Sequence, residues 1–252
     1  MNPESDWREK MINQKNKAIE VKDLVKTFGE KRAVDKLSFT VEKGTIFGLL
    51  GHNGAGKSTT IDCLLGTQKY DSANVTLLGK DPRKERKKLF QYVGVQFQEA
   101  AFQNQLKVKE ICEITHSLYE KPIDWVKTLD EFGLSAKINS FLATLSGGEK
   151  QKLCIILAIM GNPEIIFLDE LTTGLDPKAR REVWRYLLML KEKGVTIFLT
   201  SHYMDEVETL CDQILVLKNG REVASGTVKD IVEESKKDTL EEAFLTLIGE
   251  EY

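Results

Sequence analysis

The segment GHNGAGKS, residues 51–58, constrains the fold of this 252-residue chain more than any other feature of its sequence. It fits the pattern G-x-x-x-x-G-K-[ST]. An apolar run at residues 45–50, typical of a strand buried on both faces, precedes it, and a helical pattern at residues 61–66 follows it. A glycine-rich turn with an exposed lysine is the alternative interpretation. The strand and the helix on either side favour a phosphate-binding loop.

The residues of this loop suit a nucleoside triphosphate. Its three glycines let the backbone turn tightly, so that successive N–H groups point at phosphate oxygens. Lys57 supplies a compact cation to the β- and γ-phosphates, and the hydroxyl of Ser58 can bind Mg²⁺. We therefore expect ATP to contact the whole segment, which comprises Gly51, His52, Asn53, Gly54, Ala55, Gly56, Lys57, Ser58 and Thr59.

Two carboxylates, Asp169 and Glu170, end an apolar run at residues 164–170. Open parallel sheets bind ligands at the carboxyl ends of their strands, so we expect these side chains to face the phosphates. Asp169 is suited to hold Mg²⁺, whereas Glu170 can orient the water that attacks the γ-phosphate. An ordinary acidic strand end is the alternative, and the presence of a phosphate loop favours the catalytic interpretation.

Two further polar residues each follow a predicted strand. His202 comes just after the apolar run at residues 195–200, and its imidazole N–H can stabilise negative charge that develops on the γ-phosphate. Gln98 ends another strand, and its amide can reach Mg²⁺ or the attacking water. We predict that both residues act in catalysis together with Lys57 and Glu170.

The composition excludes several classes of function. Lys and Arg total 36 against 39 Asp and Glu, so a net charge of −3 gives no basis for non-specific binding to nucleic acid or anionic lipid. No apolar run reaches the roughly 18 residues of a spanning helix, and the polar first 17 residues contain no secretory signal. We expect a cytosolic location, membrane association only through a protein partner, and reduced cysteines that pack in the core: Cys63, Cys112, Cys154 and Cys211.

At LSGGEKQ, residues 145–151, the sequence resembles the signature loop of ABC-type ATPases. The other motifs of that family follow in the same order: the phosphate loop, Gln98 of the glutamine loop, the acidic strand, GLD at residues 174–176 and His202 of the switch. The resemblance covers roughly residues 18–228. It implies an α/β fold, with a P-loop NTPase core of mostly parallel sheet, an antiparallel β subdomain and an inserted α-helical subdomain.

The expected domain organisation follows from this resemblance and from the alternation of predicted strands and helices. Residues 1–17 form a polar N-terminal extension, residues 18–230 the ATPase domain, and residues 231–252 a C-terminal helical tail. Helical composition at about residues 99–150 indicates the inserted helical subdomain.

The resemblance also implies roles for residues outside the phosphate loop. Phe28 would stack on the adenine ring, as an aromatic residue does at this position in the family. The signature residues would bind the γ-phosphate of ATP held by an opposite subunit, and they are Ser146, Gly147, Gly148 and Glu149. Two chains, identical or different, would then meet head to tail around two nucleotides. Asp176 would lie at their interface.

Three residues depart from the commonest family pattern. His52 replaces a frequent Pro, Glu149 a frequent Gln, and Leu171 the Pro that often follows the catalytic Glu. None of the three removes a phosphate ligand. We expect effects on affinity or turnover rather than loss of competence.

Among ABC proteins, the sequence is similar to the nucleotide-binding subunits of bacterial exporters of drugs, antibiotic peptides, lipids or polysaccharides. This implies a transmembrane permease subunit as partner and a peripheral location at the cytoplasmic face of the cell membrane. The segment at residues 99–106 offers apolar side chains to that partner, and burial of these side chains within the chain is the alternative. A soluble ABC ATPase that acts on a cytosolic partner is the competing hypothesis for function.

Overall fold

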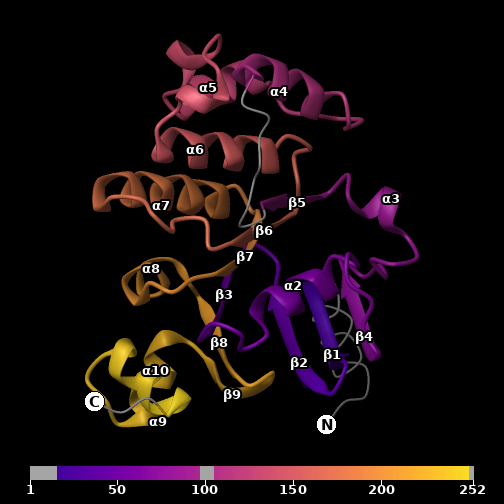
Figure 1. Ribbon diagram of the computed structural model, residues 1–252, viewed down its shortest axis with the longest axis vertical. Coiled ribbons are helices and arrows are strands. Elements are labelled where there is room, and N and C mark those ends of the chain that lie inside the picture. Colours follow the sequence, from indigo (N-terminus) through magenta and orange to yellow (C-terminus); the bar gives the residue numbers. More distant parts are fainter. Residues whose placement is uncertain (1–15, 97–104, 250–252) are drawn as a thin grey trace, which may run out of the picture.

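The computed structural model describes residues 16–96 and 105–249 and contains two β-sheets (Figure 1). The larger sheet has six strands in the spatial order β5 (Val93–Gln96), β6 (Ile165–Asp169), β7 (Thr196–Thr200), β3 (Ile46–Gly51), β8 (Gln213–Lys218) and β9 (Arg221–Gly226). The first five strands run parallel, and β9 pairs antiparallel with β8. The smaller sheet is antiparallel, in the order β2 (Lys31–Glu42), β1 (Lys17–Phe28) and β4 (Ser72–Leu77).

The central strands are apolar at nearly every position because both faces of the larger sheet are covered. Every residue of β3, β6 and β7 is buried. Side chains alternate between the two faces, so Ile46 and Phe47, which are neighbours in sequence, belong to different core clusters. On one face the rings of Phe47 and Phe198 lie 5.5 Å apart between centroids. The continuous apolar runs of the sequence are therefore explained by burial on two sides.

Helices pack against the larger sheet, and further helices lie beyond it at both ends of the molecule (Figure 1). They are α2 (Lys57–Leu64), α3 (Arg86–Leu89), α4 (Val108–His116), α5 (Trp125–Glu131), α6 (Gly147–Ala158), α7 (Pro177–Glu192), α8 (Met204–Leu210), α9 (Val228–Ser235) and α10 (Leu240–Ile248). Figure 1 places α4, α5 and α6 at one end of the molecule and α9 with α10 at the other.

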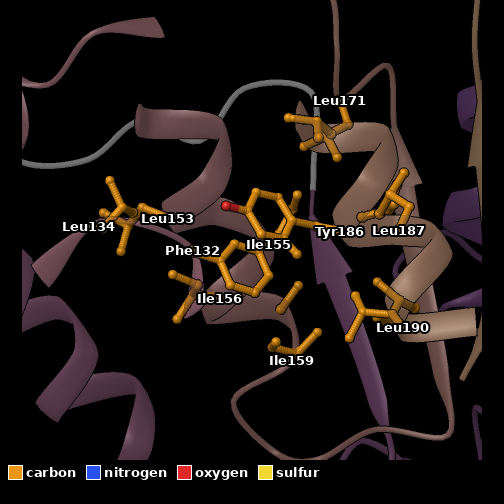
Figure 2. Packing of buried hydrophobic residues seen from close by; sticks show 14 of the residues in the cluster. Phe132, Leu134, Leu153, Ile155, Ile156, Ile159, Leu171, Tyr186, Leu187 and Leu190 are labelled. Atoms are coloured by element: carbon orange, nitrogen blue, oxygen red, sulfur yellow. The ribbon is translucent and has the colours of Figure 1, made fainter. Parts of the chain in front are cut away.

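The end formed by α4, α5 and α6 packs on the larger sheet through one hydrophobic cluster, and Figure 2 shows part of it. Phe132, directly after α5, stacks on Tyr186 of α7 with 4.0 Å between ring centroids and 9° between planes. Leu171, one of the departures from the family pattern, is 4% exposed and belongs to the same cluster. Its side chain therefore packs in the core next to the end of β6.

The α/β fold predicted from the sequence is confirmed, with differences at the ends of elements. Within the charged segment at residues 83–90, only the four residues of α3 form a helix. The antiparallel edge strand β9 was not predicted, because only one of its faces packs and its alternation is weak; Val223 is 38% exposed. Residues 99–104 of the expected helical subdomain and most of the N-terminal extension lie outside the described residues.

The C-terminal helices pack against the sheet rather than apart from it. Ile231 of α9 and Leu240 of α10 belong to a buried cluster with Leu50 of β3 and Val216 of β8. Helix α9 runs across residues 230 and 231, the expected division between the ATPase domain and the tail, and that division stays a prediction. Within the described ranges, the helices are all too short or too polar to cross a lipid bilayer.

Candidate nucleotide-binding site

The predicted phosphate loop connects the carboxyl end of β3 to the amino end of α2. Gly56 caps α2 with φ at 112°, and a Cβ atom there would lie 2.5 Å from the carbonyl oxygen of Ala33. Gly54 has φ at 81°, with no other atoms within 4 Å of a Cβ built on it. Both conformations favour glycine. The loop therefore adopts the tight turn that the sequence predicted and leaves open space above Gly54.

This open space is a cavity of about 270 Å³ bounded by the loop, the β1–β2 hairpin of the smaller sheet and the end of β6. Eight predicted site residues line it: Phe28, Asn53, Gly54, Gly56, Lys57, Ser58, Thr59 and Glu170. Lys31 and Ala33 also line the cavity, although neither was predicted from the sequence. A signal existed, because Lys31 pairs with Phe28 across a two-residue hairpin turn at residues 29–30. The lining combines an aromatic ring, glycine-rich backbone and a lysine, which suits a ligand with a planar group and phosphates.

Phe28 stands at the edge of the cavity with 48% of its surface exposed. The ammonium of Lys26 lies 4.5 Å from the centre of its ring. An exposed ring at the rim of a polar cavity offers a flat face on which a planar base can stack. This placement agrees with the adenine contact that the family resemblance implies for Phe28.

Lys57 lies inside the phosphate loop and is only 5% exposed. Its Nζ donates to the carbonyl oxygen of Gly51 at 2.9 Å and to that of His52 at 3.4 Å. Burial lowers the pKa of Lys57, and the carboxylates of Glu170 and Asp169 act in the opposite direction. The ammonium is therefore held in the loop by backbone oxygens and faces two carboxylates at the end of β6.

The carboxyl ends of β6 and β7 bring the predicted catalytic residues together. Asp169 and Thr200 are paired in register, and the hydroxyl of Thr200 donates to Oδ1 of Asp169 at 2.5 Å. The backbone N–H of Glu170 donates to that hydroxyl oxygen at 3.0 Å. Nε2 of His202 lies 2.5 Å from Oε1 of Glu170, and Nζ of Lys57 lies 4.0 Å from the same oxygen.

Glu170 adopts a left-handed backbone conformation, with φ at 52°. For a residue with a Cβ atom this conformation costs about 1–3 kcal/mol, and it persists where surrounding contacts hold it. The two hydrogen bonds to Thr200 and His202 supply such contacts. Thr200 was not predicted as a site residue, because its only signal was a hydroxyl residue at the end of an apolar run. Gln98 lies outside the described residues.

The predicted signature residues form the start of α6 and do not line the cavity. The hydroxyl oxygen of Ser146 accepts from the N–H of Glu149 at 3.3 Å, and the carboxylate of Glu149 accepts from the N–H of Ser146 at 2.8 Å. This is a reciprocal helix cap. Glu149 also pairs with Lys137 at 3.2 Å. A Cβ atom on Gly148 would lie 3.1 Å from that of Ala179, so α6 and α7 approach closely there.

Asp176, the predicted interface residue, also lies away from the cavity lining. Its carboxylate caps α7 by accepting from the N–H groups of Lys178 at 2.9 Å and Ala179 at 3.1 Å. The structure therefore brings together the loop, Phe28, Asp169, Glu170 and His202 within one chain. It leaves the signature residues and Asp176 on a separate surface.

Glu149 gives a prediction on pH-dependent stability. The N–H of Ser146 above all, and the ammonium of Lys137, lower the pKa of Glu149 below its usual value of 4.5. Its carboxylate therefore stabilises the fold above that value and loses this contribution as the pH falls through the lowered pKa. We expect Glu149→Gln to be less stable by about 0.3–1 kcal/mol at pH 7, because a neutral amide keeps the cap but loses the charge interactions. Urea unfolding at pH 7 and pH 3 measures the difference, which should shrink at pH 3.

Lys137→Gln is the companion variant for this prediction, because it removes only the ion pair. It should lose less stability at pH 7 than Glu149→Gln does. Equal stability of Glu149→Gln and the unmodified chain at both pH values would contradict the role assigned to the carboxylate.

The family model described as ABC transporter matches residues 34–173. A probable multidrug ABC transporter ATP-binding protein of Escherichia coli is 38% identical over 240 residues, which cover 91% of this chain and 41% of that protein. This chain therefore spans about two fifths of the length of that relative.

Two further relatives match over most of their own length. The Nod factor export ATP-binding protein I of Rhizobium etli is 39% identical over 223 residues, covering 86% of this chain and 70% of that protein. The linearmycin resistance ATP-binding protein of Bacillus subtilis is 36% identical over 241 residues, covering 93% and 77%. A solved structure, described as the ATP binding subunit of an ABC transporter, superposes with a TM-score of 0.83 at 28% identity. It covers 91% of this chain and 99% of that one.

Proposed function

Because this chain belongs to the ABC transporter family of ATP-binding proteins, we propose that it binds and hydrolyses ATP to power a membrane transporter. One observation carries the proposal: an exposed aromatic ring, a glycine-rich loop, a buried lysine and a strand-end carboxylate all line the same cavity. In it, Phe28 stacks on the base, and the loop N–H groups with Lys57 bind the phosphates.

Hydrolysis requires a water, a group that accepts its proton, and stabilisation of the charge on the phosphate. Glu170 orients the water and takes its proton, while the water oxygen bonds to the γ-phosphorus and the bond to the bridging oxygen of ADP breaks. His202 contacts the carboxylate of Glu170 through Nε2 and so holds it in place. The His202 ring also lies beside the reacting phosphate. Lys57 offsets negative charge on the phosphate oxygens.

The oxygen ligands at this site fit Mg²⁺. No group of three His, Cys, Asp or Glu side chains is placed to hold a metal within the ranges that the structure describes. Mg²⁺ needs no such cluster, because it usually binds one or two carboxylates together with phosphates and waters. Ser58 and Asp169 are the residues that would hold it, with Gln98 as a further ligand. Bound there, the ion neutralises charge on the β- and γ-phosphates.

We also propose that the working unit is a head-to-tail pair of ATP-binding subunits, either identical or different. The signature residues at the start of α6 and the loop ending at Asp176 lie outside the chain's own cavity. Ser146 and its neighbours at the amino end of a 12-residue helix offer N–H groups that suit a phosphate. A second subunit would present them to the ATP of the first.

The relatives support a proposal for the direction of transport and for the partner. Their names describe multidrug transport, Nod factor export and linearmycin resistance. We propose that this chain serves an exporter and sits at the cytoplasmic face of the cell membrane through a transmembrane permease subunit. Residues 99–106 are proposed to contact that subunit. We propose no nucleic-acid partner, because a net charge of −3 gives no electrostatic attraction to nucleic acid.

Co-purification from native membranes tests this proposal. The full chain carrying an affinity tag should recover an integral membrane protein, identified by mass, and ATP turnover should be higher in that complex than in the isolated chain. Recovery of a cytosolic assembly such as a ribosome, with no membrane protein, would favour the soluble ATPase instead. The same purification also separates a homodimer from a pair of different subunits, because a second ATP-binding chain would be detected by its own mass.

A further inference from the structure

Glu206 is a buried carboxylate outside the nucleotide cavity. It lies on α8 and is 4% exposed. Its Oε1 atom accepts two hydrogen bonds, from the hydroxyl of Thr172 at 2.8 Å and from Nε1 of Trp184 at 2.8 Å. Burying a carboxyl group costs free energy even when it is hydrogen-bonded, and apolar residues often stabilise such a position equally well. Stability alone therefore gives no reason for a carboxylate here.

The first partner, Thr172, belongs to the loop that follows the catalytic Glu170. Two successive turns form this loop: the N–H of Thr173 donates to the carbonyl of Glu170 at 3.2 Å, and that of Leu175 to Thr172 at 3.2 Å. Thr172 is 1% exposed, so its hydroxyl has a fixed partner in the interior. Anchoring Thr172 therefore restrains the backbone that carries the Glu170 side chain.

Glu206 itself restrains the segment that carries His202, four residues earlier in the chain. Helix α7 holds this segment at a second point, because the guanidinium of Arg180 lies 3.7 Å from the ring centre of Tyr203. Arg180 also pairs with Asp205 at 3.4 Å. Arg180 and Trp184 are four residues apart on α7 and so share one face. That face contacts the His202 segment on both sides of Asp205.

We propose that Glu206 is a positioning residue for ATP hydrolysis, which holds the loop after Glu170 and the helix after His202 at a fixed separation. This inference rests on the proposed function. Glu206 does not line the cavity. Glu206 acts through the contact between Nε2 of His202 and Oε1 of Glu170, because these two residues lie in the two segments that Glu206 joins.

Turnover and affinity of Glu206→Ala test the proposal, measured on the full chain. We expect kcat for ATP to fall about 10–100-fold, because displacement of a catalytic group by about 1 Å costs on the order of 10²-fold. The dissociation constant for ATP should change less than about twofold, since the phosphate loop keeps its contacts. Glu206→Gln keeps an acceptor oxygen for both donors and should recover kcat to within about threefold of the unmodified chain.

Two donor variants and one control separate positioning from folding. Thr172→Val and Trp184→Phe each remove one hydrogen bond and should each lower kcat by less than Glu206→Ala does. The control is Ile231→Ala, at a buried position of α9 in the C-terminal hydrophobic cluster. It should lower the thermal unfolding midpoint without lowering kcat. If Glu206→Ala does not fold, a loss of kcat in both donor variants supports the proposal, and unchanged kcat in both overturns it.

Two outcomes for Glu206→Ala would overturn the positioning role: an unchanged kcat, or a loss no larger than that of Ile231→Ala. The proposed function fails separately, if Glu170→Gln keeps full turnover. If Glu170→Gln is inactive while Glu206→Ala is fully active, the proposed function stands and only the positioning role of Glu206 fails.

Discussion

Replacing Glu170 by Gln is expected to lower ATP turnover by about 10²–10⁴-fold while ATP binding is retained. The amide has nearly the same shape and can still hydrogen-bond to Nε2 of His202, which lies 2.5 Å from Oε1 in the structure. It cannot accept a proton from the attacking water, because a neutral amide is a very weak base. The phosphate loop, Phe28 and Lys57 are unchanged, so the dissociation constant for ATP should stay within a few fold.

Steady-state phosphate release and equilibrium binding of a fluorescent ATP analogue measure the two quantities. If two subunits enclose ATP as proposed, the variant should also accumulate a dimer with ATP in size-exclusion chromatography. Glu164→Gln is the matched control, because Glu164 precedes β6 at the opposite end from Glu170 and pairs with Lys43 at 3.4 Å. It should leave turnover within about twofold. Turnover of Glu170→Gln equal to that of the unmodified chain would remove Glu170 from the mechanism.

The sequence predicted the parts of this site that depend on local structure. A glycine-rich loop between a strand and a helix has one dominant geometry, and the open space above Gly54 agrees with it. The carboxyl ends of neighbouring parallel strands meet at one edge of a sheet, where Glu170 and His202 were each predicted to act, and the structure brings the two side chains into contact there. The alternation of apolar strands with helical segments similarly indicated an α/β fold.

The parts that the sequence did not predict depend on contacts between distant segments. The hydroxyl of Thr200 joins Asp169 to the backbone of Glu170 only because β6 and β7 pair in one particular register. Nothing in the sequence around Glu206 indicates its partners, since Thr172 and Trp184 reach it from other segments of the chain. Such contacts leave no periodic signal, because each is set by tertiary packing rather than by local propensity.

Glu149 shows a departure from the family pattern that gained a physical explanation. From sequence it was an additional negative charge near a nucleotide, with an expected effect on affinity or turnover. In the structure its carboxylate completes the cap of α6 and pairs with Lys137. Its charge is therefore engaged within its own chain, and a structural contribution to the start of α6 accompanies any effect on ATP.

Lys57→Ala is expected to weaken ATP binding by about 10–100-fold, in contrast to Glu170→Gln. A hydrogen bond to a charged group contributes about 1.5–3 kcal/mol, and each 1.4 kcal/mol is about tenfold in affinity. Lys57 is 5% exposed, so its interaction with phosphate oxygens is poorly screened by solvent. Its removal also leaves Glu170 and Asp169 without the nearby ammonium, and their negative charge then repels the triphosphate. Titration with a fluorescent ATP analogue measures the loss.

Lys43→Ala separates the local effect of Lys57 from a general change in charge. Lys43 carries the same charge but pairs with Glu164, at the end of the sheet away from the cavity. Removing it should change ATP affinity by less than about twofold, because exposed charges farther apart than about 10 Å are largely screened at ordinary salt. If both variants lose affinity equally, a general electrostatic attraction replaces the specific contact. If neither loses affinity, the phosphates do not bind at Lys57 and the loop is not their site.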